Sequence, residues 1–319
     1  MARTLLRLLA VRLAMGLLSL LLVSIIVFAI TSVLPGDAAQ ERLGQEATPE
    51  AVAELRHQMG LDRPAPLRYL DWLGGMLRGD PGRSMVSDAS VRELIDARLP
   101  NTLLLAVITA AIAIPVALLL AILAAVKRGS WIDRVISMGT VAVVSVPEFL
   151  VATLAVLLLA VELHWLPALS YASDIESVGQ MLRTFAMPVL TLCCVTGAQM
   201  LRMSRAALVD QLDAPYIEMV RLKGAGLARV VLGHALPNAV GPVANAIALS
   251  MSYLLGGVIV VETIFNYPGV SKLMVEGVVQ RDMPLVQTCT MIFCAGYLAL
   301  VTLADLLGVL ANPRLRQPR

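Results

Sequence analysis

Six long apolar stretches restrict what this chain can fold into more than any other feature of its sequence. A helix needs about 20 consecutive apolar residues to cross the hydrocarbon core of a bilayer. Stretches that reach or approach this length lie at 13–34, 102–126, 135–161, 185–201, 239–261 and 286–310. Hydrophobic residues make up 58% of the 319 residues and charged residues 15%, against roughly 45–50% and about 25% in soluble domains. The sequence therefore predicts an all-α membrane protein with six transmembrane helices.

Basic residues predict the orientation of these helices, because short cytoplasmic loops are enriched in Lys and Arg. With the N-terminus inside, the inner segments hold fourteen Lys and Arg residues. The short outer loops hold only Arg183, Lys272 and Arg281. Both termini are therefore expected in the cytoplasm, and the long loop 35–101 is expected outside.

The sequence is expected to divide into three segments, which are an N-terminal segment with the first transmembrane helix (1–34), a long external loop with short helices (35–101) and a five-helix core (102–319). In the external loop, Thr48 and Pro49 are typical of a helix start and Gly60 of its end. Residues 90–93 have the form of a capping box and predict a second short helix toward Leu99. This loop has no apolar core of its own, so it suits a lid or a docking surface better than a separate domain.

The cytoplasmic loop 202–238 contains a short regular segment. Pro215 is typical of a helix start, and Gly224 predicts the end of a helix over 215–223. Such a helix reaches only ~15 Å, which is too short to cross a bilayer. It would therefore lie at the cytoplasmic face, with an apolar ridge formed by Tyr216, Met219 and Val220.

Glu218, Gly224 and the pair Leu236-Pro237 follow one another at a spacing that resembles the EAA loop of ATP-binding-cassette importer permeases. That loop has the form E-A-A, three residues, G, nine residues and I-x-L-P. The sequence departs from it at Met219, Val220 and His234. The segment His-Ala-Leu-Pro-Asn at 234–238 resembles the branch of the family that transports dipeptides, oligopeptides and nickel.

Further stretches along the whole chain resemble the same branch. They are Leu-Pro-Gly-Asp at 34–37, Gly-Leu-Asp-Arg-Pro at 60–64, Val-Glu-Thr-Ile-Phe at 261–265, Tyr-Pro-Gly-Val at 267–270 and, near the C-terminus, Asp305 with Asn-Pro-Arg at 312–314. The resemblance implies the fold of a type I importer permease, a multi-pass protein of the inner (cytoplasmic) membrane of a prokaryote.

The resemblance also implies partners. A second permease subunit, which can be a different chain, two ATP-binding-cassette ATPase subunits and an extracytoplasmic substrate-binding protein would complete the importer. The short helix would be the coupling helix that docks on an ATPase. The residues assigned to this coupling are Pro215, Tyr216, Glu218, Met219, Val220, Arg221, Lys223, Gly224, His234, Leu236 and Pro237.

ATP hydrolysis is not expected in this chain. The phosphate-binding pattern G-x-x-x-x-G-K-[ST] needs a lysine directly after a glycine, and none of Lys127, Lys223 and Lys272 has one. ATP and Mg would therefore be bound by the partner ATPases, and no cofactor or metal is expected in this chain. The net charge of +2 gives no reason to expect a nucleic acid partner.

Polar residues inside apolar stretches are candidates for the translocation path, because they are costly in a bilayer. Glu148 follows Pro147, where a kink is expected, and it could meet the amino end of a substrate or cap the second half of a broken helix. The other candidates are Gln199, Asn245, Ser252 and Tyr253, for which hydrogen bonds between helices are the alternative. Asp305 is expected to pair with a cytoplasmic arginine.

Two external segments are expected to contribute to the docking surface for a binding protein, around Trp72 and around Tyr267, Pro268 and Gly269. The expected cargo is short peptides. Nickel chelates, opines, glutathione and sugars stay open, since related permeases transport them. An ion-driven secondary transporter is the alternative from another class, although internal repeats and clustered intramembrane carboxylates would be expected in one.

Overall fold

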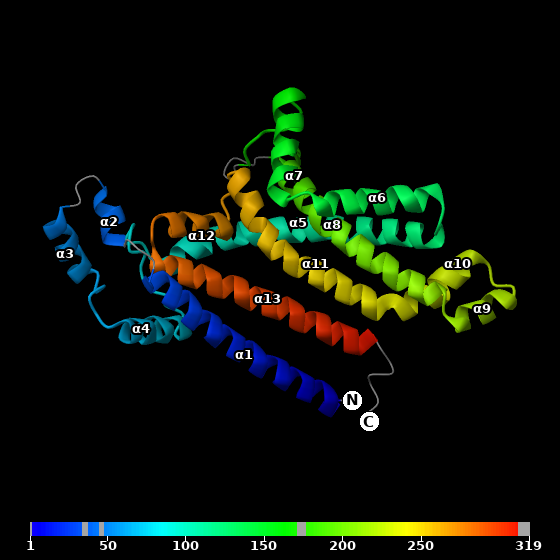
Figure 1. The fold of residues 1–319 in the computed structure, drawn as a ribbon, viewed down its shortest axis with the longest axis horizontal. Helices are drawn as coiled ribbons and strands as arrows, with labels where there is room; N and C mark the ends of the chain where they lie inside the picture. Colours follow the sequence, from blue (N-terminus) through cyan, green and yellow to red (C-terminus); the bar gives the residue numbers. More distant parts are fainter. Residues whose placement is uncertain (1, 34–37, 45–47, 171–176, 312–319) are drawn as a thin grey trace. The chain divides into compact units, whose positions relative to one another are not determined.

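The computed structural model describes residues 2–33, 38–44, 48–170 and 177–311, and these residues are mainly helical (Figure 1). Within those ranges the only β interaction is an isolated bridge between Arg83 and Ser90. In chain order the elements are α1 (Ala2–Val33), α2 (Ala38–Leu43), α3 (Pro49–Gln58), α4 (Ala65–Leu77), α5 (Val91–Val126), α6 (Trp131–Ser145), α7 (Glu148–Ala155), the π-helical η2 (Val156–Glu162), α8 (Val178–Leu212), α9 (Pro215–Leu222), α10 (Leu227–Val230), the π-helical η3 (Val231–Ala235), α11 (Leu236–Ile264), α12 (Val270–Val279) and α13 (Met283–Ala311).

Five helical segments in the described part of the chain are long and apolar enough to cross a membrane. They are Leu9–Ser32, Val91–Val126, Gly179–Leu212, Leu227–Ile264 and Met283–Leu306. The bent pair of α6 with α7 and η2 gives a sixth span when it is counted as one. The prediction of an all-α, multi-span membrane protein is confirmed.

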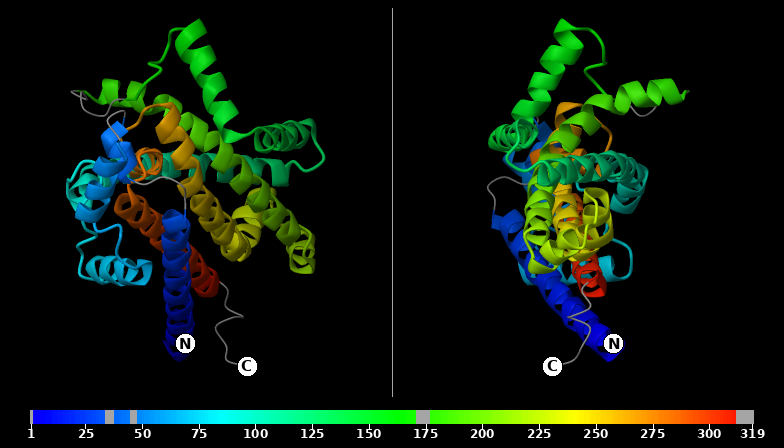
Figure 2. Two further views of the ribbon diagram at one scale, coloured as in Figure 1. Left: turned by 60° about the vertical axis from the view of Figure 1, so that its left-hand side comes forward. Right: turned by 90° about the vertical axis from the view of Figure 1, so that its right-hand side faces the viewer.

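The third predicted span is broken rather than kinked. The axes of α6 and of α7 with η2 differ by 102°, and Figure 2 shows α7 turning sharply away from the end of α6. Val146 and Pro147 have extended backbones between the two helices, with ψ of 129° and 142°. The cause is Pro147, because a proline removes a backbone donor and disfavours a helical conformation in the residue before it.

Two other spans are longer than predicted. The short helix expected near 90–99 and the second span form a single helix, α5, that begins at Val91 and passes through Pro100 and Pro115. Helix α8 continues to Leu212, so residues 202–212 belong to a helix and not to the cytoplasmic loop. Apolarity marks a span only up to its first charges. Helix α8 continues beyond them, with Arg202 bonded to Gln199 and Arg205 paired with Asp133.

Contacts divide the chain into two compact units that are interleaved in sequence. One unit comprises Met1–Arg12, Leu104–Phe265 and Tyr297–Arg319, and the other comprises Leu13–Leu103 and Asn266–Gly296. This division differs from the three consecutive segments expected from the sequence, because the boundary falls inside α1, α5 and α13. The first is called the coupling unit here and the second the external-loop unit.

In the coupling unit, α8 and α11 lie against each other (Figure 2). Small residues on α5 form one wall of the core at a spacing of four, namely Ala117, Ala121 and Ala125. Leu208 of α8 and Val243 of α11 are buried in the same cluster. A buried ion pair joins α6 to α8, because Arg205 Nε and Nη2 lie 2.7 and 2.9 Å from the two carboxylate oxygens of Asp133.

In the external-loop unit, residues of the long loop pack on α12 and on the start of α13. The buried cluster contains Val91, Ile95, Val270, Leu273, Leu285 and Cys289. Buried Asp282 accepts hydrogen bonds from Ser84 Oγ and from the backbone N–H of Met85. Thr48 caps α3 through Ala51 N at 3.2 Å, as predicted. The loop therefore has no separate core and shares one with the neighbouring helices.

Candidate functional site

The loop between α8 and α11 contains the predicted coupling helix, and local signals set its bounds. Helix α9 runs from Pro215 to Leu222 with proline in its first turn, Glu218 early and Arg221 late. These charges suit the helix dipole. Gly224 follows the end of the helix at a φ of +80°, which a residue with a side chain adopts only with strain. The predicted helix over 215–223 is confirmed to within one residue.

Ile217 anchors α9 to the following segment. It is fully buried in a cluster with Val230 and Ala235, and half-buried Leu212, Val220 and Ala225 pack around these three. Sequence analysis missed Ile217, although a residue three positions before Val220 lies on the same face of a helix. Val220 belongs to this inner face, so the prediction that it forms part of an outward ridge was wrong.

The outward face of α9 carries three apolar side chains at a spacing of three residues. Tyr216 is 38% exposed, Met219 61% and Leu222 81%. Leu222 was not predicted because it directly precedes the charged end of the helix. The hydroxyl of Tyr216 donates to Gln211 Oε1 at 2.9 Å. Partial burial raises the pKa of Tyr216 above its usual range.

The second half of the motif is continuous with the start of α11. His234 lies in η3 and is half-buried, and its backbone carbonyl accepts a hydrogen bond from Asn238 Nδ2 at 2.7 Å. Half-buried Leu236 packs against the core cluster of the coupling unit. Exposed Pro237 lies in the first turn of α11, which follows η3 without a break. Glu218, Arg221 and Lys223 are exposed.

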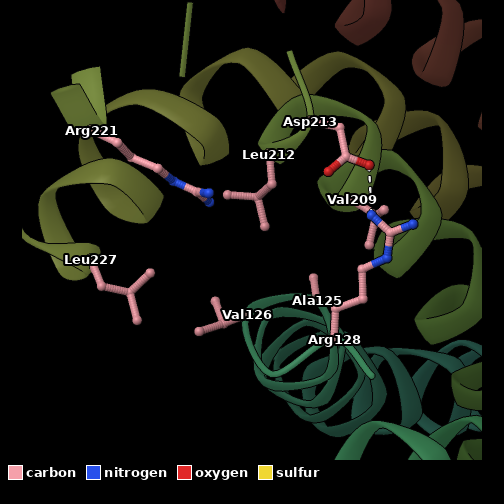
Figure 3. A pocket seen from close by; sticks show the side chains of 8 residues that line it. All are labelled: Ala125, Val126, Arg128, Val209, Leu212, Asp213, Arg221 and Leu227. Carbon is pink, nitrogen blue, oxygen red and sulfur yellow. Dashed lines mark hydrogen bonds and ion pairs between the residues drawn. The ribbon is translucent and has the colours of Figure 1, made fainter. Parts of the chain in front are cut away.

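A cavity of about 200 Å³ lies beside α9. Its walls come from the ends of α5 and α8 and from the segments that follow them (Figure 3). Arg128 Nη1 and Asp213 Oδ2 form an ion pair of 2.6 Å at its edge, and Arg221 extends into it from α9. The sequence indicated basic residues on this side of the membrane, but it did not indicate that two of them line one cavity.

Among the candidates for the translocation path, Glu148 has the most distinctive surroundings. It is the first residue of α7, and its carboxylate lies against Gly257 of α11. A Cβ on Gly257 would lie 2.9 Å from Glu148 Oε2 and 3.3 Å from Oε1. A side chain at this position would therefore require the end of the Glu148 side chain to shift.

The other path candidates are scattered. Buried Ser252 donates to the carbonyl of Ala248 in its own helix at 2.9 Å. Gln199 accepts from Arg202 at 2.9 Å. Asn245 and Tyr253 are exposed. In the described ranges, no hydrogen bond or ion pair joins any two of the five candidates. Asp305 forms an ion pair with Arg12 at 2.8 Å, as predicted.

The external docking candidates face inward more than expected. Tyr267 is fully buried, and its hydroxyl donates to the carbonyl of Asn101 at 2.8 Å. Gly269 is buried and Pro268 half-buried. Trp72 is half-buried, with its ring 6.2 Å from that of Tyr69. Tyr267 thus stabilises the packing of the segment before α12 against α5. Its side chain does not lie on the surface, where a docking residue was expected.

Comparison with known proteins identifies the family. The family model described as binding-protein-dependent transport system inner membrane component matches residues 117–317, and a second model for the N-terminal part of such components matches residues 5–106. The chain belongs to this family of inner membrane components. It is therefore a permease subunit of an ATP-driven importer and a multi-pass protein of a prokaryotic inner membrane.

Relatives cover nearly the whole permease. A probable peptide ABC transporter permease of Sinorhizobium fredii is 32% identical over 92% of this chain and 94% of its own length. A putative peptide transport system permease of Brucella abortus is 35% identical over 96% and 97%. The glutathione transport system permease GsiC of Pectobacterium atrosepticum is 36% identical over 93% and 95%. The resemblance to the peptide branch is confirmed.

Membership in the family has two further consequences for this permease. Its family is one of membrane permeases and not of catalysts, and it implies partner ATPases and a substrate-binding protein. It also sets aside the secondary transporter that was considered from the sequence.

Proposed function

We propose that this permease forms part of a translocation path for short peptides that an external binding protein delivers. The support comes from two groups of relatives, one named for peptides and one for glutathione, which is itself a small peptide. We further propose that α9 is the helix that docks on a separate ATPase subunit. This assignment rests on the distribution of apolar side chains on α9. Tyr216, Met219 and Leu222 are exposed on its outward face, while Ile217 on its inner face is buried.

The packing of α9 suits the transmission of motion. An exposed apolar strip of this kind is typical of a helix that docks in a groove of a partner. Its inner residue Ile217 contacts Val230 at the end of α10 and Ala235 at the end of η3, directly before α11. Half-buried Leu212 belongs both to this cluster and to the core around α8. A displacement of α9 would therefore move the ends of two transmembrane helices together, because close-packed clusters transmit displacement.

We propose that the assembled importer contains a second permease chain, two ATPase subunits and the external binding protein. ATP and Mg would bind to the ATPase subunits. Glu218 and Lys223 are exposed beside the apolar strip, where they can form rim ion pairs worth roughly 0.2–1 kcal/mol each. Most of the docking energy would then come from burial of the strip.

The docking proposal is tested with Leu222→Glu and a matched control, Leu77→Glu. Both leucines lie at the end of a helix, and they are 81% and 80% exposed. A charge at Leu222 would be buried without a partner in the ATPase groove. We expect Leu222→Glu to lose most ATPase subunits in a mild-detergent pull-down, while Leu77→Glu retains them. Equal retention by the two variants would contradict the docking role of α9.

The cargo is tested separately by competition for uptake. Cells that depend on this importer are given a labelled dipeptide with an excess of unlabelled dipeptide, longer peptide, glutathione, nickel chelate or sugar. We expect only the peptides, with or without glutathione, to compete. Competition by the nickel chelate or the sugar alone would assign a different cargo and leave the docking result unaffected.

A further inference from the structure

The cavity beside α9 lies at the ends of three helical segments that are long and apolar enough to span a membrane. Its lining residues are Ala125, Val126, Arg128, Val209, Leu212, Asp213, Arg221 and Leu227. Three of them are the ends of candidate spans, since one span ends at Val126, another ends at Leu212 and a third begins at Leu227. Val126 is also the last residue of the apolar stretch 102–126, and Lys127 and Arg128 follow it directly. Basic residues directly after a span are typical of its cytoplasmic interface, so this wall of the cavity is expected at headgroup depth.

The charges of the cavity favour an anion. Arg128 is paired with Asp213 at 2.6 Å, with about half of each side chain exposed. Arg221 contributes a second guanidinium from α9 (Figure 3), and within the described ranges it forms no ion pair. Two arginines and one aspartate leave a formal excess of one positive charge. The remaining lining residues, among them Val126 and Leu227, are apolar.

We propose that this cavity binds the phosphate of an anionic phospholipid headgroup. A guanidinium offers two parallel donors to phosphate oxygens, and basic pockets between transmembrane helices on the cytoplasmic side are typical headgroup sites. The apolar walls suit the glycerol and the first acyl carbons of a lipid. Inorganic phosphate shares the anionic chemistry but has nothing to place against these walls.

Such a lipid would bear directly on coupling. Arg221 belongs to α9, and Asp213 lies between α8 and α9. A headgroup held by Arg221 would compete with Asp213 for Arg128, which follows the end of α5. Anionic lipid is therefore expected to fix α9 against the ends of α5 and α8, and the coupling of the importer is expected to depend on it.

The test measures how much phosphatidylglycerol stays bound to the assembled importer. Complexes of wild type and variants are purified in mild detergent and analysed by native mass spectrometry after exchange into mixtures with phosphatidylcholine. We expect Arg221→Gln to weaken retention about tenfold, since a hydrogen bond to a charged group is lost. We expect Asp213→Asn to strengthen retention, because it frees Arg128 for the phosphate.

Matched controls separate this site from general attraction to charge. Arg229→Gln and Asp210→Asn change the same charges at exposed residues outside the cavity, and both should leave retention unchanged. If Asp213→Asn lowers retention, the ion pair is structural only and the proposal fails. Equal effects of Arg221→Gln and Arg229→Gln would also overturn it, as would displacement of the lipid by inorganic phosphate at equal affinity, which would assign the cavity to a soluble anion.

Discussion

Replacement of Arg205 by methionine should destabilise the permease more than the replacement of an exposed arginine would. Arg205 contacts both carboxylate oxygens of Asp133, at 2.7 and 2.9 Å. The side chain of Asp133 is 8% exposed and that of Arg205 26%. Arg205→Met keeps most of the aliphatic stem but leaves a buried carboxylate without its counter-charge.

The expected magnitude follows from what remains around Asp133. Breaking a buried ion pair by removal of one partner costs roughly 3–5 kcal/mol. The carboxylate still accepts hydrogen bonds from Gly129 N at 2.9 Å and from Ser137 Oγ at 3.3 Å, which offsets part of the loss. We therefore expect about 3 kcal/mol for Arg205→Met. The double variant with Asp133→Asn removes both charges and should recover most of that loss.

The assay is the free energy of unfolding in detergent micelles, measured for both single variants and the double variant. The control is Arg63→Met, which breaks an ion pair of 2.8 Å whose side chains are 56% and 60% exposed. This pair should contribute about 1 kcal/mol or less. If Arg205→Met costs no more than Arg63→Met, or if the double variant is no more stable than Arg205→Met alone, the account of a buried counter-charge is refuted.

Three further predictions concern the site. Ile217→Ala should leave ATPase subunits bound but reduce transport per ATP hydrolysed several-fold, because the fully buried anchor of α9 is lost. Transport and ATP hydrolysis are measured together in proteoliposomes, and an unchanged ratio would contradict this expectation. Gly257→Ala should impair transport by displacing the carboxylate of Glu148, which a Cβ would approach to 2.9 Å, and the shorter Glu148→Asp should restore part of it in an uptake assay. Gly224→Ala should destabilise the end of α9 by about 1 kcal/mol, since a φ of +80° strains the backbone of any residue with a Cβ. Hydrogen exchange at the amides of α9 measures this, and unaltered protection would refute the requirement for glycine.

The bounds of α9 could be predicted because local residues determine them. Pro215 and Gly224 act on the backbone at their own positions. The length of α8 could not be predicted in this way, because its continuation past its first charges depends on a partner of Arg205 that lies 72 residues earlier in the chain. The sharp break at Pro147 was indicated by the proline, but its angle depends on the packing of α7 against α8 and α11.

The same distinction applies to single side chains. Tyr216 and Val220 are both apolar residues of α9, and only the position of the segment before α11 decides that Val220 turns inward. From the sequence, Tyr267 was expected on the surface of an external loop. In the structure its hydroxyl donates a hydrogen bond to the carbonyl of Asn101, and its side chain is fully buried. A motif can thus assign residues to one functional segment, while long-range packing determines which of them face a partner.

The spacing of the family motif has a physical explanation in this packing. Ile217, next to Glu218, contacts Val230 and Ala235, and Ala235 directly precedes Leu236. Leu236 in turn packs against the core around α5, α8 and α11. The first half of the motif is therefore held to its second half by buried contacts, and the second half is held to the membrane helices. An insertion between Gly224 and Val230 would keep every motif residue but separate these contacts, so we expect it to abolish coupled transport while α9 itself still forms.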